Sequence, residues 1–142
     1  MNIRTLLLTS LGIPVYMLVP SPSTAGADFP LCGFEKRHQC VVDGDTFWYQ
    51  GTKYRLYEID APEVGDGAKC RQEYDFGMKA TYLLQSLWQS GITSITQHGL
   101  DRYGRTLVTV QTGNGDASGQ ILEAGLAEPF GGRVRADWCS GS

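Results

Sequence analysis

Residues 40–59 read CVVDGDTFWYQGTKYRLYEI, and this stretch decides the fold. It contains three runs rich in β-branched and aromatic residues, as is typical of strands, at residues 40–42, 46–49 and 53–59. Asp43-Gly44 separates the first two runs, and Gln50-Gly51-Thr52 forms a turn before the third. Short strands joined by tight turns pair antiparallel, so the stretch predicts the start of an antiparallel sheet.

The residues that follow predict a helix, two strands and a shorter helix. Between residues 72 and 90 the apolar residues recur at helical spacing, at Phe76, Ala80, Leu83, Leu84 and Leu87. Residues 92–97 and 106–111 alternate as strands do, with a turn at 101–105 between them. Residues 116–124 predict a short helix that Asp116 or Ser118 caps and Gly125 ends. This order predicts an α+β, mainly β fold with two or three helices, such as the five-stranded OB-fold barrel.

The N-terminal segment has the pattern of a secretory signal peptide. Arg4 precedes an uncharged run over residues 5–20, and Ala25-Gly26-Ala27 matches an A-x-A cleavage site. A retained membrane anchor is the alternative, but the run is short for a bilayer and Pro14 interrupts it. We therefore expect a signal peptide at 1–27, one domain at 28–142, and a secreted or periplasmic protein that is not attached to a membrane.

The charge balance limits the possible nucleic-acid partners. The 142 residues carry a formal net charge of −3, with 12 Lys and Arg against 15 Asp and Glu. Sequence-independent coating of DNA needs a basic surface that releases counterions, so that class of protein is disfavoured. A hydrolase with a local cationic pocket remains compatible with this charge.

Four cysteines in an exported chain predict two disulfides. A zinc site is the alternative, but the chain has no C-x-x-C pair, and His38 and His98 lie far apart. Of the three possible pairings, we predict that Cys32–Cys40 ties the N-terminus to the barrel. Cys70–Cys139 would then hold the C-terminal tail.

Three segments concentrate the ionisable residues: VVDGDT at 41–46, YRLYEIDAPE at 54–63 and DRYGR at 101–105. Their order resembles the D-G-D-T, R-x-x-x-x-D-x-P-E and D-x-Y-G-R motifs of the staphylococcal-nuclease (thermonuclease) family, over residues 40–127. The resemblance implies a monomeric, calcium-dependent nuclease that hydrolyses DNA and RNA with little sequence preference and leaves 3′-phosphate ends.

The resemblance also implies a role for each matching residue. Asp45, Asp60 and the backbone carbonyl of Ala61 would hold Ca²⁺, with Asp43 close by. Glu63 would be the base that activates water. The arginines that hold the phosphate would be Arg55 and Arg105, with Tyr103 beside it as a hydrogen-bond donor.

Physical chemistry supports these roles independently. An all-oxygen ligand set selects a hard cation such as calcium. Planar guanidinium groups bind two phosphate oxygens at once, which lysines cannot do. A carboxylate within one hydrogen bond of a water can accept its proton.

Several observations leave alternatives open. Strict strand alternation puts Arg55 and Asp60 on opposite faces, so their convergence requires a bend near residues 59–62. Residues 64–70 are a short segment containing a cysteine, and Phe130 is only a candidate platform for base stacking. The rival functions are a non-catalytic OB-fold module that binds nucleic acid or a polyanion in the cell envelope, and an envelope protein in which calcium is only structural.

Overall fold

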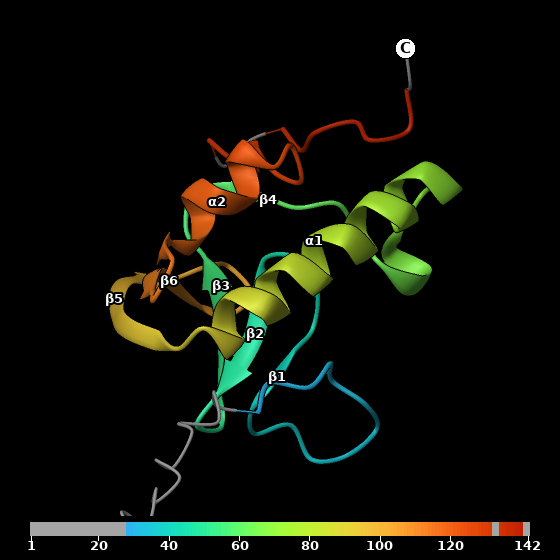
Figure 1. Ribbon diagram of the computed structural model, residues 1–142. Helices are drawn as coiled ribbons and strands as arrows, with labels where there is room; N and C mark the ends of the chain where they lie inside the picture. Colours follow the sequence, from blue (N-terminus) through green and yellow to red (C-terminus); the bar gives the residue numbers. More distant parts are fainter. Residues whose placement is uncertain (1–27, 132–133, 141–142) are drawn as a thin grey trace, which may run out of the picture.

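The computed structural model describes residues 28–131 and 134–140, so the expected signal peptide lies outside the described residues (Figure 1). In chain order the elements are β1 (Cys40–Val41), β2 (Thr46–Tyr49), β3 (Thr52–Leu56), β4 (Ile59–Asp60), the 3₁₀ turn η1 (Gly65–Gly67), α1 (Arg71–Gln89), β5 (Ile92–Leu100), β6 (Thr106–Thr112), β7 (Gly115–Asp116), α2 (Ala117–Glu123) and β8 (Glu128–Pro129). No helix within the described ranges is both long and apolar enough to cross a membrane.

The main sheet has the strand order β1-β2-β3-β6-β5, and β7 pairs with β6. β3 and β6 are parallel, whereas the other neighbouring strands of this sheet are antiparallel. β4 and β8 form a separate two-stranded antiparallel sheet. The predicted α+β, mainly β fold is therefore confirmed. The sheet also begins with antiparallel strands within residues 40–59, as predicted.

The expected closure of the barrel is not found, because among the described residues β1 and β5 do not pair and the sheet stays open. The outer edge of β1 is occupied by the incoming chain: Val41 donates its N–H to the carbonyl of Pro30 at 2.9 Å, and Cys32 donates to Val41 at 2.8 Å. β5 has irregular register at two places. An edge strand that already has a partner cannot also close a barrel.

One hydrophobic core lies between the sheet and the helices. Phe47 of β2 packs against Trp88 of α1 with ring centroids 4.7 Å apart, and both side chains are fully buried. Phe29, near the start of the described chain, packs on the same tryptophan. In Figure 1, α1 runs along the sheet, and α2 lies beyond the end of β3. Asp116 caps α2 by accepting the N–H of Gly119 at 2.7 Å, and Gly125 follows with a positive φ of 68°.

The structure contains the two disulfides expected from the sequence. Cys32–Cys40 closes a short loop before the sheet, and Cys70–Cys139 joins the residue before α1 to the C-terminal tail. Their Cα atoms are 4.9 and 5.9 Å apart, within the range of ordinary disulfides.

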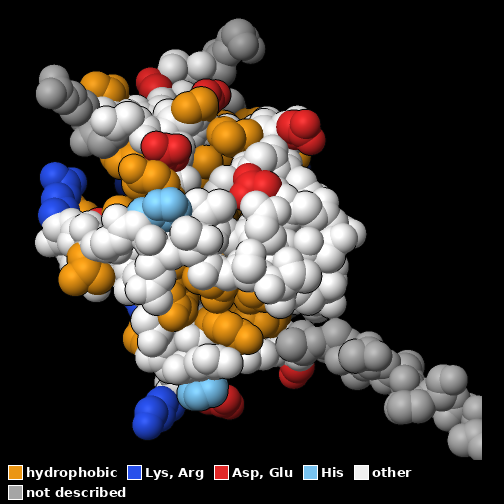
Figure 2. All heavy atoms as spheres, turned by 90° about the vertical axis from the view of Figure 1, so that its left-hand side faces the viewer, with side chains coloured by type: hydrophobic (Ala, Val, Ile, Leu, Met, Phe, Trp, Pro, Cys, Tyr) orange, Lys and Arg blue, Asp and Glu red, His pale blue; other side chains and the backbone are white. Residues whose placement is uncertain are grey.

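The face on the β5 side has little charge. β5 contains no Lys, Arg, Asp or Glu, and Figure 2 shows mostly uncharged side chains and backbone on this face, with charged groups mainly near its margins. This face therefore does not present the basic surface that sequence-independent coating of a nucleic acid needs.

Candidate active site

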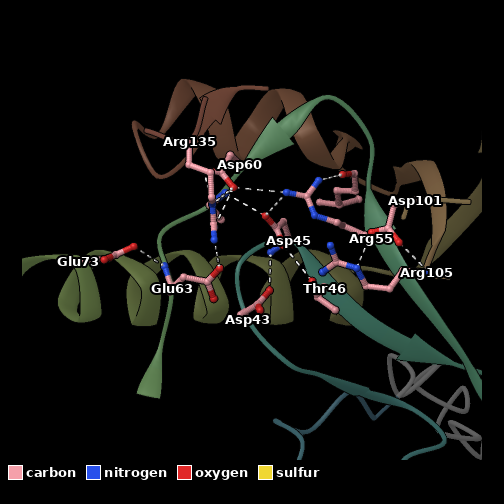
Figure 3. Close-up of polar contacts among 12 residues, drawn as sticks. Asp43, Asp45, Thr46, Arg55, Asp60, Glu63, Glu73, Asp101, Arg105 and Arg135 are labelled. Carbon is pink, nitrogen blue, oxygen red and sulfur yellow. Dashed lines mark hydrogen bonds and ion pairs between the residues drawn. The ribbon is translucent and has the colours of Figure 1, made fainter. Parts of the chain in front are cut away.

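Three charged residues from the first strands meet in the interior. Nη2 of Arg55 lies 3.3 Å from Oδ2 of Asp45 and 3.4 Å from Oδ1 of Asp60. Their exposed fractions are only 7% for Arg55, 6% for Asp45 and 2% for Asp60. Buried charges need partners, and here one guanidinium nitrogen contacts both carboxylates (Figure 3).

A backbone turn brings Arg55 and Asp60 to the same side. β3 ends at Leu56, and Glu58 has a positive φ of 61°, which is rare for a residue other than glycine. Because of this turn, the side chains before and after it no longer alternate between the two faces of one continuous strand. The predicted bend therefore exists, but at Tyr57-Glu58 rather than at residues 59–62.

The Asp43-Gly44-Asp45 segment packs tightly against α1. A Cβ added to Gly44 would overlap the Cβ of Ala80 and lie 2.9 Å from that of Ala61, so glycine is needed for close approach. Asp45 accepts the backbone N–H of Ala61 at 3.0 Å, which fixes Ala61 beside it. Burial and the negative charges of Asp45 and Glu63 raise the pKa of Asp43 to about 7.

Glu63 is held by a residue that the sequence analysis did not single out. Glu73, in the first turn of α1, accepts the N–H of Glu63 at 3.3 Å and that of Lys69 at 2.8 Å. Its exposed fraction is 5%. Gly77 of α1 lets residues 62–64 pack closely, since an added Cβ would lie 2.5 Å from the carbonyl oxygen of Glu63. Glu73 therefore clamps both ends of the loop after the candidate base.

A compact loop between β5 and β6 positions Arg105. Nε of Arg105 lies 2.7 Å from Oδ2 of Asp101, while Oδ1 of Asp101 accepts the N–H groups of Tyr103 and Arg105, each at 2.9 Å. Partial burial opposes the charge of Asp101, but these hydrogen bonds outweigh it and lower its pKa. Tyr103 is exposed, and the Arg105 guanidinium lies 5.5 Å from its ring centroid.

The charged side chains of the three motifs border one pocket of about 680 Å³. Its lining includes the predicted residues Asp45, Arg55, Asp60, Glu63, Tyr103 and Arg105, together with Asp43 and Phe130. Ala61 lies behind the pocket and is 3% exposed. The structure thus brings together the side chains that the three motifs supply.

Some aromatic and histidine residues have structural partners. Phe130 has the Arg55 guanidinium 5.4 Å from its ring centroid, so this ring is already engaged on one side. His98 stacks on Tyr57 at 4.4 Å and hydrogen-bonds Thr109 at 2.8 Å. His38 is exposed. Neither histidine belongs to the pocket lining.

Arg135 is a site residue that the sequence analysis missed. Its Nη1 lies 2.6 Å from Oε1 of Glu63, and its Nη2 lies 2.9 Å from Oδ1 of Asp60. Burial opposes its charge, yet the hydrogen bonds to Asp60 and Glu63 raise the pKa of Arg135 further. The only sequence signal was indirect: Arg135 precedes Cys139 by four residues, and the predicted Cys70–Cys139 bond brings this tail near the loop after Glu63.

The described side chains alone do not form a complete metal-binding site. Within residues 28–131 and 134–140, no group of three or more His, Cys, Asp or Glu side chains has a metal-binding arrangement. The oxygen donors that converge are Asp45 and Asp60, and the N–H of Ala61 donates to Oδ2 of Asp45. Any hard cation here would complete its shell with a carbonyl and water.

Comparison with known proteins assigns most of the candidate site residues to a segment that matches a known family. A profile of staphylococcal nuclease homologues matches residues 53–135, which include Arg55, Asp60, Glu63 and Arg105 but not Asp45. Proteins named "Probable endonuclease LCL3" from two Candida albicans strains, WO-1 and SC5314, are each 31% identical over 88 residues. That alignment spans 59% of this chain and 37% of each relative's length. The chain belongs to the staphylococcal nuclease homologue family.

Proposed function

We propose that the protein is an exported, calcium-dependent endonuclease that hydrolyses phosphodiester bonds of DNA and RNA with little sequence preference. Family membership supports a nuclease, and the observation that carries the proposal is the pocket that gathers two carboxylates, a candidate base and two arginines. A module that only binds nucleic acid has no need of an acid cluster that repels phosphate.

The residues present fit a calcium ion. Asp45 and Asp60 both lie within 3.4 Å of one Arg55 nitrogen, so the two carboxylates converge and already hold a positive charge close to both of them. Carboxylates, the Ala61 carbonyl and water are the oxygen ligands that calcium prefers. When bound, the ion would supply Lewis acidity toward a non-bridging phosphate oxygen.

The chain's own residues would carry out the other tasks. Glu63 accepts a proton from the attacking water, whose oxygen bonds to phosphorus as the bond to the 5′-oxygen breaks. Arg55 and Arg105 bind the equatorial phosphate oxygens as negative charge grows there. Tyr103 donates its hydroxyl to the phosphate. The products are a 3′-phosphate and a 5′-hydroxyl that takes its proton from solvent.

The proposal places the working protein outside the cytoplasm. Two disulfides are compatible with an oxidising compartment, and the sequence of residues 1–27 favours export. In this proposal the mature protein begins near Asp28, acts as a monomer in the periplasm or medium, and has nucleic acid as its partner.

The test is cleavage of denatured DNA and of RNA by the purified protein in millimolar calcium and in excess chelator. We expect both substrates to be cut in calcium and neither in chelator. Binding without cleavage would favour the non-catalytic module instead. Undiminished cleavage in chelator would contradict the calcium mechanism.

A further inference from the structure

The C-terminal tail is fixed beside the candidate site. Cys139 is bonded to Cys70, and Trp138 packs against Phe76 of α1 with ring centroids 5.8 Å apart. Asp137 accepts the N–H of Cys139 at 3.0 Å, which stabilises a turn there. Residues 134–140 are therefore anchored next to the N-terminal half of α1, and Arg135 is the cation that this tail presents to the pocket.

The guanidinium of Arg135 engages both oxygens of Asp60. Its Nε lies 3.2 Å from Oδ1 and 3.3 Å from Oδ2, and its Nη2 lies 2.9 Å from Oδ1. Oδ1 also accepts from Nη2 of Arg55 at 3.4 Å. Three of these four contacts fall on Oδ1, whereas Oδ2 accepts only the Nε–H that it shares with Oδ1. A cation that coordinates Asp60 through Oδ1 therefore competes directly with the arginine N–H groups, and one guanidinium must withdraw.

Arg135 is better able to withdraw than Arg55. The Arg135 side chain is 48% exposed, whereas that of Arg55 is 9% exposed. Withdrawal of Arg135 toward solvent therefore costs less than withdrawal of Arg55, which would have to leave a buried position. Arg135 also contacts Oε1 of Glu63, so its guanidinium lies beside the candidate base as well.

We propose that Arg135 is an internal competitor of the divalent cation: it pairs with Asp60 and Glu63, and a cation that binds these carboxylates must displace it. The inference rests on the proposed calcium site and adds the residue that determines its affinity. A ligand that must displace a bound group loses the free energy of that group's contacts, so the apparent metal affinity is weaker than the site's own. Tethering through Cys70–Cys139 keeps the local concentration of Arg135 high.

Calcium titration of the purified protein by isothermal calorimetry tests the exchange in Arg135→Gln. The variant no longer has to give up charge-assisted hydrogen bonds to Asp60 and Glu63, so we expect the calcium Kd to fall about tenfold or more. Arg102→Gln is the matched control. It removes the same charge from the same pocket, but its guanidinium lies over the Tyr103 ring, 4.8 Å from the centroid, so its Kd should stay within about twofold of wild type.

Thermal unfolding supplies a second measurement. Without calcium, Arg135→Gln loses its contacts to two carboxylates and should melt lower than wild type. Saturating calcium should remove most of this difference, because the metal replaces the guanidinium. A purely structural Arg135 would leave the same melting difference with and without calcium.

The outcomes separate this inference from the proposed function. Equal calcium Kd in wild type and Arg135→Gln, or weaker binding in the variant, overturns the inference alone. If neither protein binds calcium, the inference and the calcium site fall together. Equal tightening in Arg102→Gln also overturns it, because net charge would then explain the change.

Discussion

At the scale of the residue, the site depends on where individual side chains lie rather than on the overall charge. The motif residues Arg55, Asp60 and Glu63 were predicted, because their types and spacing carry the chemistry. Glu73 and Arg135 were not predicted. In the sequence, Glu73 looks like an ordinary acidic residue in the first turn of a helix, and Arg135 looks like an ordinary basic residue near the C-terminus. Only their tertiary contacts place them at Glu63.

Replacing the candidate base tests its role with almost no change in volume. Glu63→Gln should lower kcat about 10²- to 10⁴-fold, because an amide cannot accept the proton of water. Circular dichroism would confirm that the fold is retained. Glu58→Gln is the control, because Glu58 borders the same pocket but has no assigned role. Comparable losses in both variants would remove Glu63 from the mechanism.

Lysine substitutions test the arginines, because they keep the positive charge but remove the planar guanidinium group. Arg55→Lys and Arg105→Lys should each lower kcat/KM roughly 10²-fold or more, since an ammonium cannot form the two parallel hydrogen bonds to phosphate. Arg71→Lys serves as the control, because the Arg71 side chain is 83% exposed and pairs only with Asp75 among the ion pairs of the described chain. Near-parent rates for both site variants would show that the phosphate lies elsewhere.

At the scale of the element, α1 is the part that the sequence predicted best. The helical spacing of its apolar residues predicted a helix over residues 72–90, and the observed helix spans Arg71–Gln89. β3 was predicted to reach Ile59 but ends at Leu56, because Tyr57-Glu58 makes a turn that the local pattern of residue types does not encode. That turn brings Arg55 to Asp60, so the need for a bend was predicted from the sequence, but its position was not.

Gly77 links α1 to the candidate base. In an exposed helix, Gly→Ala stabilises by about 1 kcal/mol, but here the new methyl would lie 2.5 Å from the Glu63 carbonyl oxygen. We expect Gly77→Ala to destabilise the protein by roughly 1–3 kcal/mol in urea unfolding and to lower activity, because residues 62–64 must shift.

Gly33→Ala provides the comparison, since an added Cβ there meets nothing within 4 Å. Its stability should change by less than about 1 kcal/mol. A Gly77→Ala protein as stable and active as the parent would show that α1 does not set the position of Glu63.

At the scale of the whole molecule, the sequence of strands and helices along the chain could be predicted, but whether the sheet closes could not. The incoming chain at residues 30–32 pairs with β1 and leaves the barrel open, and this contact lies outside any recognisable strand pattern. The tail is likewise placed by long-range contacts: the Cys70–Cys139 disulfide, the packing of Trp138 on Phe76 and the ion pairs of Arg135. Such contacts determine the arrangement where local sequence patterns are weak.

Removing each bridge separates their contributions. Loop entropy predicts about 4 kcal/mol for Cys70–Cys139, which spans 69 residues, and about 2.5 kcal/mol for Cys32–Cys40, which spans 8. The Cys70→Ser/Cys139→Ser protein should therefore unfold at lower denaturant than Cys32→Ser/Cys40→Ser. The opposite order would show that the tail adds little to the stability of the fold.

The most direct test of the central claim is the initial rate of single-stranded DNA cleavage against calcium concentration, for wild type and Asp45→Asn. Asp45 contacts both Arg55 and the Ala61 backbone, so the amide removes a ligand charge at the centre of the site. We predict saturable, calcium-dependent cleavage by wild type. Asp45→Asn, with its fold verified by circular dichroism, should need at least about tenfold more calcium or show no cleavage. Identical calcium curves for the two proteins, or a wild-type rate independent of calcium, would contradict the account.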